Sequence, residues 1–188
     1  FNLNGPIFSK KDEQGNKISS LFGYFIAGDV TFRKDGRPIS TDVYKVNDDE
    51  LKWLEENPLR PSGLGSGTYP NTSYVGFDQM DKVGYTQNTS NYSVNLSGKL
   101  DVKTTETINL TFGGSYYYRN SSNYSYFNSM FNYKNNAESW NNTWRVFGRF
   151  SQRFPASQES TSIVKNVYYS IQVDYTKDRG GTHDPHHK

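Results

Sequence analysis

The chain alternates apolar and polar residues with a period of two, over segments longer than ordinary strands. Between Asn91 and Val102 the even positions form an apolar row: Tyr92, Val94, Leu96, Gly98, Leu100 and Val102. The odd positions form a polar row: Asn91, Ser93, Asn95, Ser97, Lys99 and Asp101. Because successive side chains of a strand point to opposite faces, this pattern predicts a strand with one apolar and one wet face.

The same alternation recurs along the chain. It predicts six strands, near residues 1–8, 20–33, 90–102, 106–118, 141–154 and 166–177. Each run lasts about 10 to 12 residues, whereas strands of soluble domains average about 5 to 6 and a tilted strand needs about 9 to 11 to cross a bilayer. Aromatic residues gather toward the strand ends, as in the interfacial girdles of barrels. We therefore predict an all-β fold, an antiparallel transmembrane β-barrel segment; an ordinary soluble sandwich is the alternative.

Composition narrows the function classes. Only 33% of residues are hydrophobic, yet the chain holds 15 Tyr and 12 Phe, which suits neither a typical soluble core nor a disordered chain. No cysteine is present, so disulfides and thiolate metal sites are excluded. The net charge of +2 argues against nucleic-acid binding. No nucleophile elbow, phosphate loop or dinucleotide fingerprint occurs, so we predict neither an enzyme nor a cofactor.

Connection lengths give the predicted strands a direction. Modest connections at residues 9–18, 103–106 and 155–165 alternate with long ones at 34–88 and 119–139. Outer-membrane barrels have short periplasmic turns and long extracellular loops, so the long connections are predicted to be extracellular. Another external loop is expected to open at Asp178. We interpret both ends of the chain as truncations, and we find no signal peptide in it.

The first long connection contains one predicted helix. Asn47 is expected to cap it, with Glu50 at the capping-box position three residues later. Leu51, Trp53 and Leu54 supply an apolar side, and Asn57-Pro58 ends the helix. Its acidic first turn, Asp48 to Glu50, could hold calcium, although favourable contact with the helix N-terminus is the commoner explanation.

Charged residues on the polar faces are predicted to line an aqueous lumen. These residues are Arg145, Arg149, Arg153, Lys99 and Asp101. The arginines could meet an anionic substrate, or pair with carboxylates of a plug domain or of neighbouring strands. The neighbouring candidates are Asp29, Asp101 and Asp174.

Aromatic residues of the second long connection are the candidate ligand contacts. They are Tyr124, Tyr126, Phe127, Phe131, Tyr133 and Trp140, set among Asn and Ser. Such rings could stack on sugars or contact peptides. Alternatively, they pack the loops on one another, over the barrel mouth or against a partner.

A metal site has weak candidates only, namely His183, Asp184, His186 and His187. Imidazole and carboxylate are competent ligands. Adjacent histidines of a strand would point to opposite sides, however, so we favour a solvated loop.

Several segments resemble the barrel of TonB-dependent outer-membrane receptors. Asn4-Gly5-Pro6-Ile7, a charged turn and then Leu21 to Ile26 resemble the early barrel of that family, where a GGPI strand end, a polar periplasmic turn and an aromatic strand follow in that order. Asn95 to Asp101 and Ile108 to Tyr116 are similar to its next hairpin, and Trp144 to Phe150 is similar to a later strand. The texture is closest to the SusC-like and Oar-like receptors of Bacteroidota.

The resemblance implies a barrel of roughly 22 strands, of which about six would be present, with the plug and the rest of the barrel absent. It implies the bacterial cell outer membrane, contact with its lipid bilayer, and uptake of a glycan, peptide or chelate driven by TonB through the missing plug. A SusD-like surface lipoprotein or other outer-membrane complex subunits are the implied partners. The alternatives are a passive porin or structural barrel subunit, and a secreted β-sandwich that binds carbohydrate. The substrate is not readable from these residues.

Overall fold

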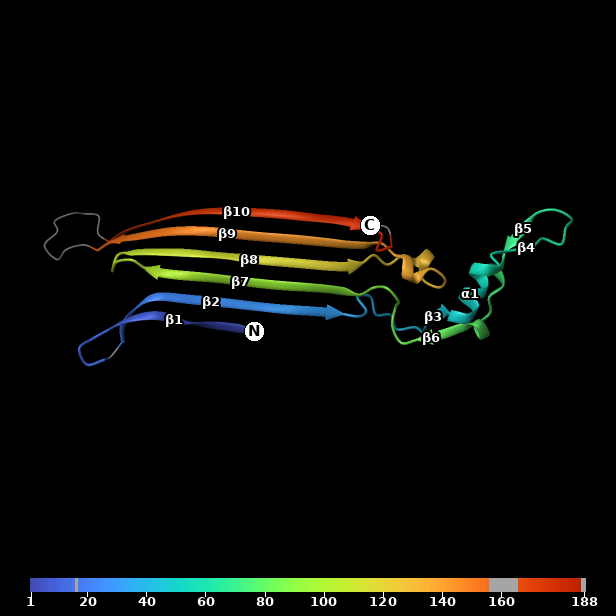
Figure 1. The fold of residues 1–188 in the computed structure, drawn as a ribbon, viewed down its shortest axis with the longest axis horizontal. Helices are drawn as coiled ribbons and strands as arrows, with labels where there is room; N and C mark the ends of the chain where they lie inside the picture. The colour runs from blue at the N-terminus through green and yellow to red at the C-terminus, as the bar shows by residue number, and fades with distance from the viewer. Residues whose placement is uncertain (16, 156–165, 187–188) are drawn as a thin grey trace. The chain divides into compact units, whose positions relative to one another are not determined.

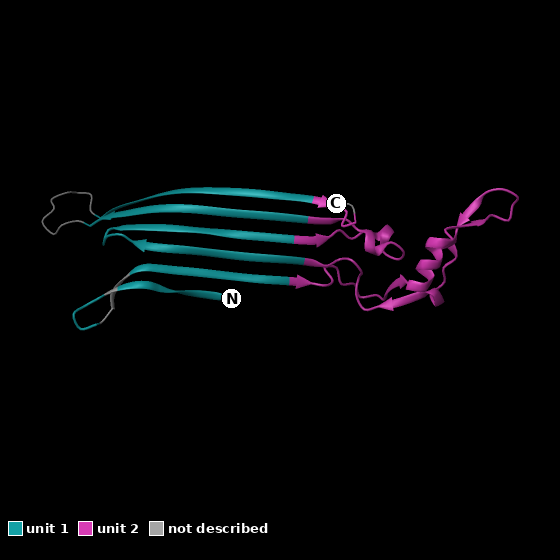
Figure 2. Cartoon of the chain, in the orientation of Figure 1, with its two compact units in different colours: residues 1–31, 92–119, 140–181 teal, residues 32–91, 120–139, 182–188 magenta. Residues whose placement is uncertain are grey.

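The computed structural model describes residues 1–15, 17–155 and 166–186. The chain forms two compact units, shown in teal and magenta in Figure 2. We call Phe1–Thr31, Tyr92–Arg119 and Trp140–Gly181 the sheet unit. We call Phe32–Asn91, Asn120–Ser139 and Thr182–Lys188 the loop unit.

A six-stranded sheet of long strands, in which chain order is spatial order, makes up the sheet unit (Figure 1). The strands are β1 (Asn2–Lys11), β2 (Lys17–Arg33), β7 (Asn91–Lys103), β8 (Ile108–Ser122), β9 (Glu138–Phe154) and β10 (Val167–His183). Each overlaps one predicted strand range. The order is linear, with β1 and β10 at the edges, so the sheet is open within the described residues.

The pairing of β1 with β2 is antiparallel, with Leu3 opposite Ile26. Its register shifts between Pro6 and Phe8. Proline has no backbone N–H to donate to the ladder, so an irregularity of this kind is expected beside Pro6.

The strands run further than the sequence pattern predicts. β8 continues to Ser122 and β9 begins at Glu138, inside the range expected to be loop. The expectation that a loop opens at Asp178 is wrong, because β10 continues to His183. Asn141 and Thr143 of β9 both donate hydrogen bonds to the Asp178 carboxylate. Hydrogen-bonded polar side chains extend the sheet here. Such residues do not alternate with apolar ones, so the sequence pattern did not predict this part of the strands.

One face of the sheet is lined with apolar side chains that remain exposed. Ile171 is 61% exposed and Val173 is 74% exposed, and Phe112, Leu96 and Val146 are also exposed. Rings on neighbouring strands meet one another, with 5.3 Å between the centroids of Trp144 and Tyr175 and 5.9 Å between those of Phe154 and Tyr169. In the described residues, no fully buried side chain belongs to the sheet unit.

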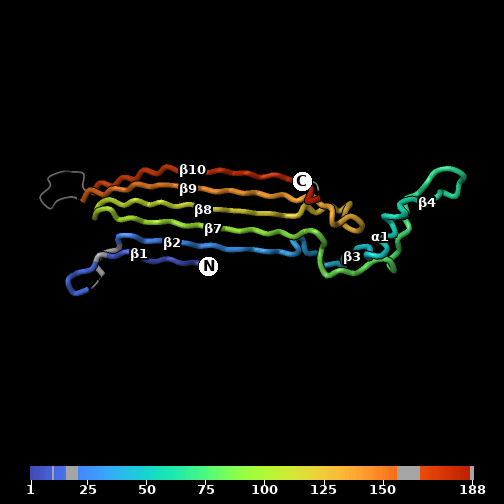
Figure 3. Tube along the Cα trace, viewed as in Figure 1, coloured from blue at the N-terminus to red at the C-terminus, as the bar shows by residue number. Residues whose placement is uncertain are grey.

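The loop unit is built from short elements, and Figure 3 traces the chain through them. β3 (Val43–Val46) pairs antiparallel with β6 (Met80–Val83), and β4 (Leu59–Pro61) pairs antiparallel with β5 (Thr68–Pro70). Helix α1 spans Asp48–Glu56, and 3-10 turns lie at Asn71–Tyr74, Phe77–Gln79, Tyr126–Asn128 and Tyr133–Asn135. No helix in the described part of the chain has the length and hydropathy to cross a bilayer.

A small core holds the loop unit together. Its buried apolar side chains are Val46, Leu54 and Tyr133. The backbone N–H of Val46 donates to the carbonyl of Met130 at 3.1 Å, which joins the two long connections. The predicted cap of α1 is confirmed, because the Asn47 side chain accepts a hydrogen bond of 2.8 Å from the backbone N–H of Glu50. The helix ends at Asn57, as predicted.

Candidate functional site

The polar face of the sheet carries a network of charged and amide side chains. Arg145 of β9 forms an ion pair with Asp174 of β10 at 3.0 Å, and the predicted pairing with an acidic neighbour is present. Arg149 donates two hydrogen bonds, of 2.9 and 2.7 Å, to the side-chain oxygen of Gln172. Side chains of β10 therefore supply hydrogen-bond partners for Arg145 and Arg149 of β9.

A second part of this network lies on β7 and β8. Lys99 pairs with Asp101 at 3.0 Å, and the hydroxyl of Thr111 donates to the same carboxylate at 2.7 Å. Asp29 accepts a longer hydrogen bond, 3.4 Å, from Asn95. Arg153 has no ion-pair partner among the described residues, so its guanidinium is open to other groups.

The six aromatic candidates for ligand contact lie in different surroundings. Tyr126 and Phe127 are 74% and 93% exposed and meet edge to face, with 6.3 Å between ring centroids. Tyr133 is only 7% exposed, and its hydroxyl accepts a hydrogen bond of 3.3 Å from the Lys45 ammonium group. Tyr133 thus belongs to the core, in agreement with loop packing for this residue.

The other three candidates are intermediate in exposure. Tyr124 and Phe131 are partly exposed residues of the loop unit. Trp140 lies in β9 of the sheet unit, where its indole nitrogen would be 3.3 Å from a Cβ added at Gly181. Glycine at this position leaves room for the indole ring.

Two of these rings, Tyr124 and Tyr126, line a groove in the loop unit. We call it the tyrosine groove, and its volume is about 350 Å³. Its lining residues are Arg37, Ile39, Asp42, Val43, Tyr44, Thr86, Gln87, Tyr124, Tyr126, Ser129 and Met130. This size falls within the usual range of small-molecule sites.

Asp35 fixes the backbone on one side of the tyrosine groove. Its carboxylate accepts hydrogen bonds from the backbone N–H groups of Arg37 and Thr86, at 2.7 and 2.8 Å, and from the Thr89 hydroxyl at 3.1 Å. Partial burial favours the neutral acid, but these donors outweigh burial and lower the pKa of Asp35. The anion therefore ties residues 35–37 to residues 86–89.

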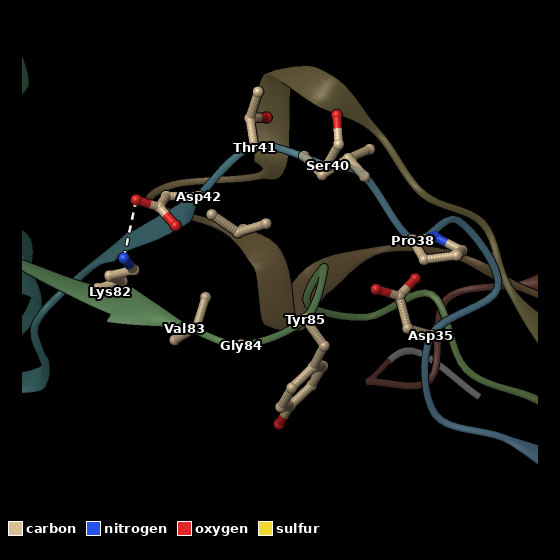
Figure 4. Close-up of a pocket in the computed structure, with 11 residues that line it drawn as sticks. Asp35, Pro38, Ser40, Thr41, Asp42, Lys82, Val83, Gly84 and Tyr85 are labelled. Atoms are coloured by element: carbon tan, nitrogen blue, oxygen red, sulfur yellow. Dashed lines mark ion pairs between the residues drawn. The ribbon is translucent and has the colours of Figure 1, made fainter.

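A more open hollow of about 530 Å³ shares Ile39, Asp42 and Val43 with the tyrosine groove. Figure 4 shows the Asp42 carboxylate turned toward Lys82, with which it pairs at 2.8 Å. The hydrogen bond and the negative charge of Asp42 raise the pKa of Lys82. This pairing neutralises the Asp42 charge that borders both hollows.

The weak metal candidates form no site in the described residues. The backbone N–H of His186 donates to the Asp184 carboxylate at 2.9 Å, and the His186 ring lies 3.4 Å from the carbonyl of Lys134. His183 ends β10, and His187 lies outside the described residues. No group of three His, Asp or Glu side chains there is arranged to hold a metal. At the start of α1, Asp48 instead pairs with Lys45 at 3.3 Å.

Of the residues that line the tyrosine groove, sequence reasoning proposed only Tyr124 and Tyr126. Arg37, Tyr44 and Met130 come from separate stretches of the two long connections, and no periodic pattern relates them. The Asp35-Gly36 turn dipeptide was the one local signal that the chain bends beside Arg37.

Comparisons with protein-family models, with curated proteins and with solved structures found no match. Function must therefore be inferred from the two-faced sheet and from the tyrosine groove.

Proposed function

We propose that this chain is part of the barrel of a TonB-dependent outer-membrane receptor, which takes up a large nutrient or serves in an outer-membrane complex. The observation that supports this proposal most is the apolar face of six long strands, whose side chains stay exposed in the described residues. In water, contiguous apolar patches beyond a few hundred Å² are rare on stable monomers. Contact with lipid would remove this face from water. The favourable free energy of that transfer is about 25 cal/mol per Å² of apolar surface.

The length of the strands also favours a position across a lipid bilayer. β2, β9 and β10 each contain 17 residues. At about 3.3 Å per residue and a tilt of about 40 to 45°, such a strand rises roughly 40 Å along a barrel axis. The hydrocarbon core of a bilayer is about 30 Å thick, so these strands are long enough to cross it and to project beyond it.

The opposite face suits an aqueous lumen. Its ion pairs and hydrogen bonds, such as those of Arg145 and Arg149, would be costly in hydrocarbon and are ordinary in water. The two edge strands, β1 and β10, would pair with further strands of a closed barrel, which leaves no free edge. Arg145, Arg149, Arg153, Lys99 and Asp101 are then residues of the lumen.

The receptor role rests on the family resemblance of the sequence. TonB acting through a plug, a SusD-like lipoprotein and the bacterial outer membrane are the partners that this role would require. A glycan, peptide or chelate would be the cargo.

Fractionation of cells that express the complete protein tests the barrel. We expect extraction only with detergent from outer membranes, and a gel mobility that changes when the sample is heated before electrophoresis. Release into aqueous buffer without detergent would contradict the barrel and favour a secreted sandwich. Deletion of TonB tests the receptor role, because uptake of the cargo or release of bound ligand should then stop. If the deletion changes neither, the barrel is a porin or a structural subunit.

A further inference from the structure

The tyrosine groove has an uncompensated positive charge. Asp42 is paired with Lys82 at 2.8 Å. Among residues 1–15, 17–155 and 166–186, the guanidinium of Arg37 has no ion-pair or hydrogen-bond partner. The groove therefore offers free N–H donors suited to a carboxylate.

Three polar side chains of the groove, those of Thr86, Gln87 and Ser129, already donate hydrogen bonds to the backbone. Thr86 donates to the carbonyl of Arg37 at 3.3 Å, and Gln87 donates to that of Tyr85 at 3.2 Å. Ser129 donates to the carbonyl of Tyr126 at 2.7 Å. These three groups therefore have fewer hydrogen bonds left to give to the hydroxyl groups of a sugar ring.

The remaining lining is apolar or aromatic. Ile39, Met130 and Tyr126 are all exposed residues of this lining. Tyrosine and methionine surfaces favour flat, apolar rings, because ring stacking and sulfur–aromatic contacts add to burial.

We propose that the tyrosine groove binds an aromatic carboxylate, such as the C-terminal aromatic residue of a peptide or a free aryl acid. The ring lies against Tyr126, Met130 and Ile39, and the carboxylate accepts hydrogen bonds from Arg37. This inference goes beyond the barrel proposal and does not depend on it, because every lining residue belongs to the loop unit.

Ligand-observed NMR titration of the complete chain in detergent micelles tests the proposal, with N-acetylphenylalanine as the probe. We expect saturable binding with a Kd at or below about 1 mM. The neutral N-acetylphenylalanine amide should bind at least about tenfold more weakly, because it lacks the charge that Arg37 recognises. Phenylpropionate lacks the peptide group of this probe. Equal binding of phenylpropionate would indicate a free aryl acid as the ligand, and weaker binding would indicate a peptide terminus.

Two variants separate recognition from folding. Arg37→Gln should weaken binding of the acid about tenfold or more and leave binding of the amide unchanged. Arg33→Gln, an exposed arginine of the loop unit outside the groove, should leave both affinities unchanged. Tyr126→Ser should weaken acid and amide equally, because it removes ring contact and no charge.

Equal binding of acid and amide, or equal affinity of the Arg37→Gln and Arg33→Gln variants, would overturn the proposal. Preferential binding of glucose or maltose would overturn it in favour of a saccharide site. No saturable binding of the acid up to about 10 mM would also overturn it, whatever the outcome of the membrane experiments.

Discussion

Within the part of the chain that the structure describes, the loop unit has a small buried core and the sheet unit has none, although both units expose apolar side chains. In the described residues, the sheet unit has long apolar rows and no fully buried side chain, whereas the loop unit buries Val46, Leu54 and Tyr133. The buried polar residues of the described chain also all belong to the loop unit. They are Asn71, Thr86, Thr89 and Asn136.

This difference concerns where each unit could bury apolar surface. The loop unit buries a few apolar groups in a small core and anchors its backbone through side chains such as Asp35, although Leu64, Phe77 and Phe127 stay exposed. The sheet unit leaves an apolar face for something else to cover, and we propose that lipid covers it. Each prediction below tests one side of this contrast.

Leu54→Ala should give the largest effect. Leu54 is buried on α1, and truncation of a buried leucine costs about 2 to 5 kcal/mol. Hydrogen exchange of the α1 amides measures this loss. Lys52→Ala, at a neighbouring exposed position of the same helix, is the matched control and should cost much less. Equal effects of the two variants would show that the loop unit has no core of its own.

Ile171→Arg should destabilise the protein in lipid vesicles by about 2 to 4 kcal/mol, the cost of arginine near the middle of the lipid face of a barrel. Urea unfolding in vesicles measures it. Ser170→Arg is the control, because Ser170 lies on the polar face, where its hydroxyl meets that of Ser151. An Ile171→Arg variant as stable as the control would place this face in water, where a position that is 61% exposed tolerates arginine.

The Asp35 carboxylate should keep its charge to unusually low pH. Its pKa is lowered, so its stabilising effect is complete above the ordinary value of 3.8 and is lost as the pH falls through the lower folded value. The amide proton shifts of Arg37 and Thr86 should report a midpoint below 3.8. Asp35→Asn should abolish this titration and cost roughly 1 to 2 kcal/mol of local stability. A midpoint at or above 3.8 would contradict the anchoring role.

Removal of the ion pair between Arg145 and Asp174 should have the smallest effect on stability. Their side chains are 46% and 40% exposed, and a pair in contact with water contributes about 0.2 to 1 kcal/mol. A double-mutant cycle with alanine at both positions measures the coupling. Arg153→Ala with Asp174→Ala is the control cycle and should show none. A coupling of several kcal/mol would mean that the polar face excludes water, contrary to a wet lumen.

The sequence predicted most of the six-stranded sheet but few residues of the tyrosine groove. Alternation such as that of Leu96, Leu100 and Phe112 revealed the strands, because one apolar face forces a period of two. It could not reveal the last residues of β10, where Asp178 is held by hydrogen bonds from Asn141 and Thr143. Polar pairing of this kind leaves no periodic trace.

The loop unit shows the same limit. The cap at Asn47 was predictable because capping is local in sequence. β3 pairs with β6, and Arg37 and Met130 line the same groove, although in both cases the segments lie far apart in the sequence. Such contacts depend on how the connections fold back, which no short pattern records.

Lipid contact of the apolar face is tested most directly by spin labels placed one at a time at Leu96, Phe112 and Ile171, with Ser97, Asn109 and Gln172 as controls on the opposite face. In bilayers, the account predicts that lipid-dissolved oxygen relaxes the first three labels and that a water-soluble nickel chelate relaxes the three controls. If the labels at Leu96, Phe112 and Ile171 respond to the nickel chelate, or to neither reagent, then water or protein covers that face and the barrel proposal is wrong.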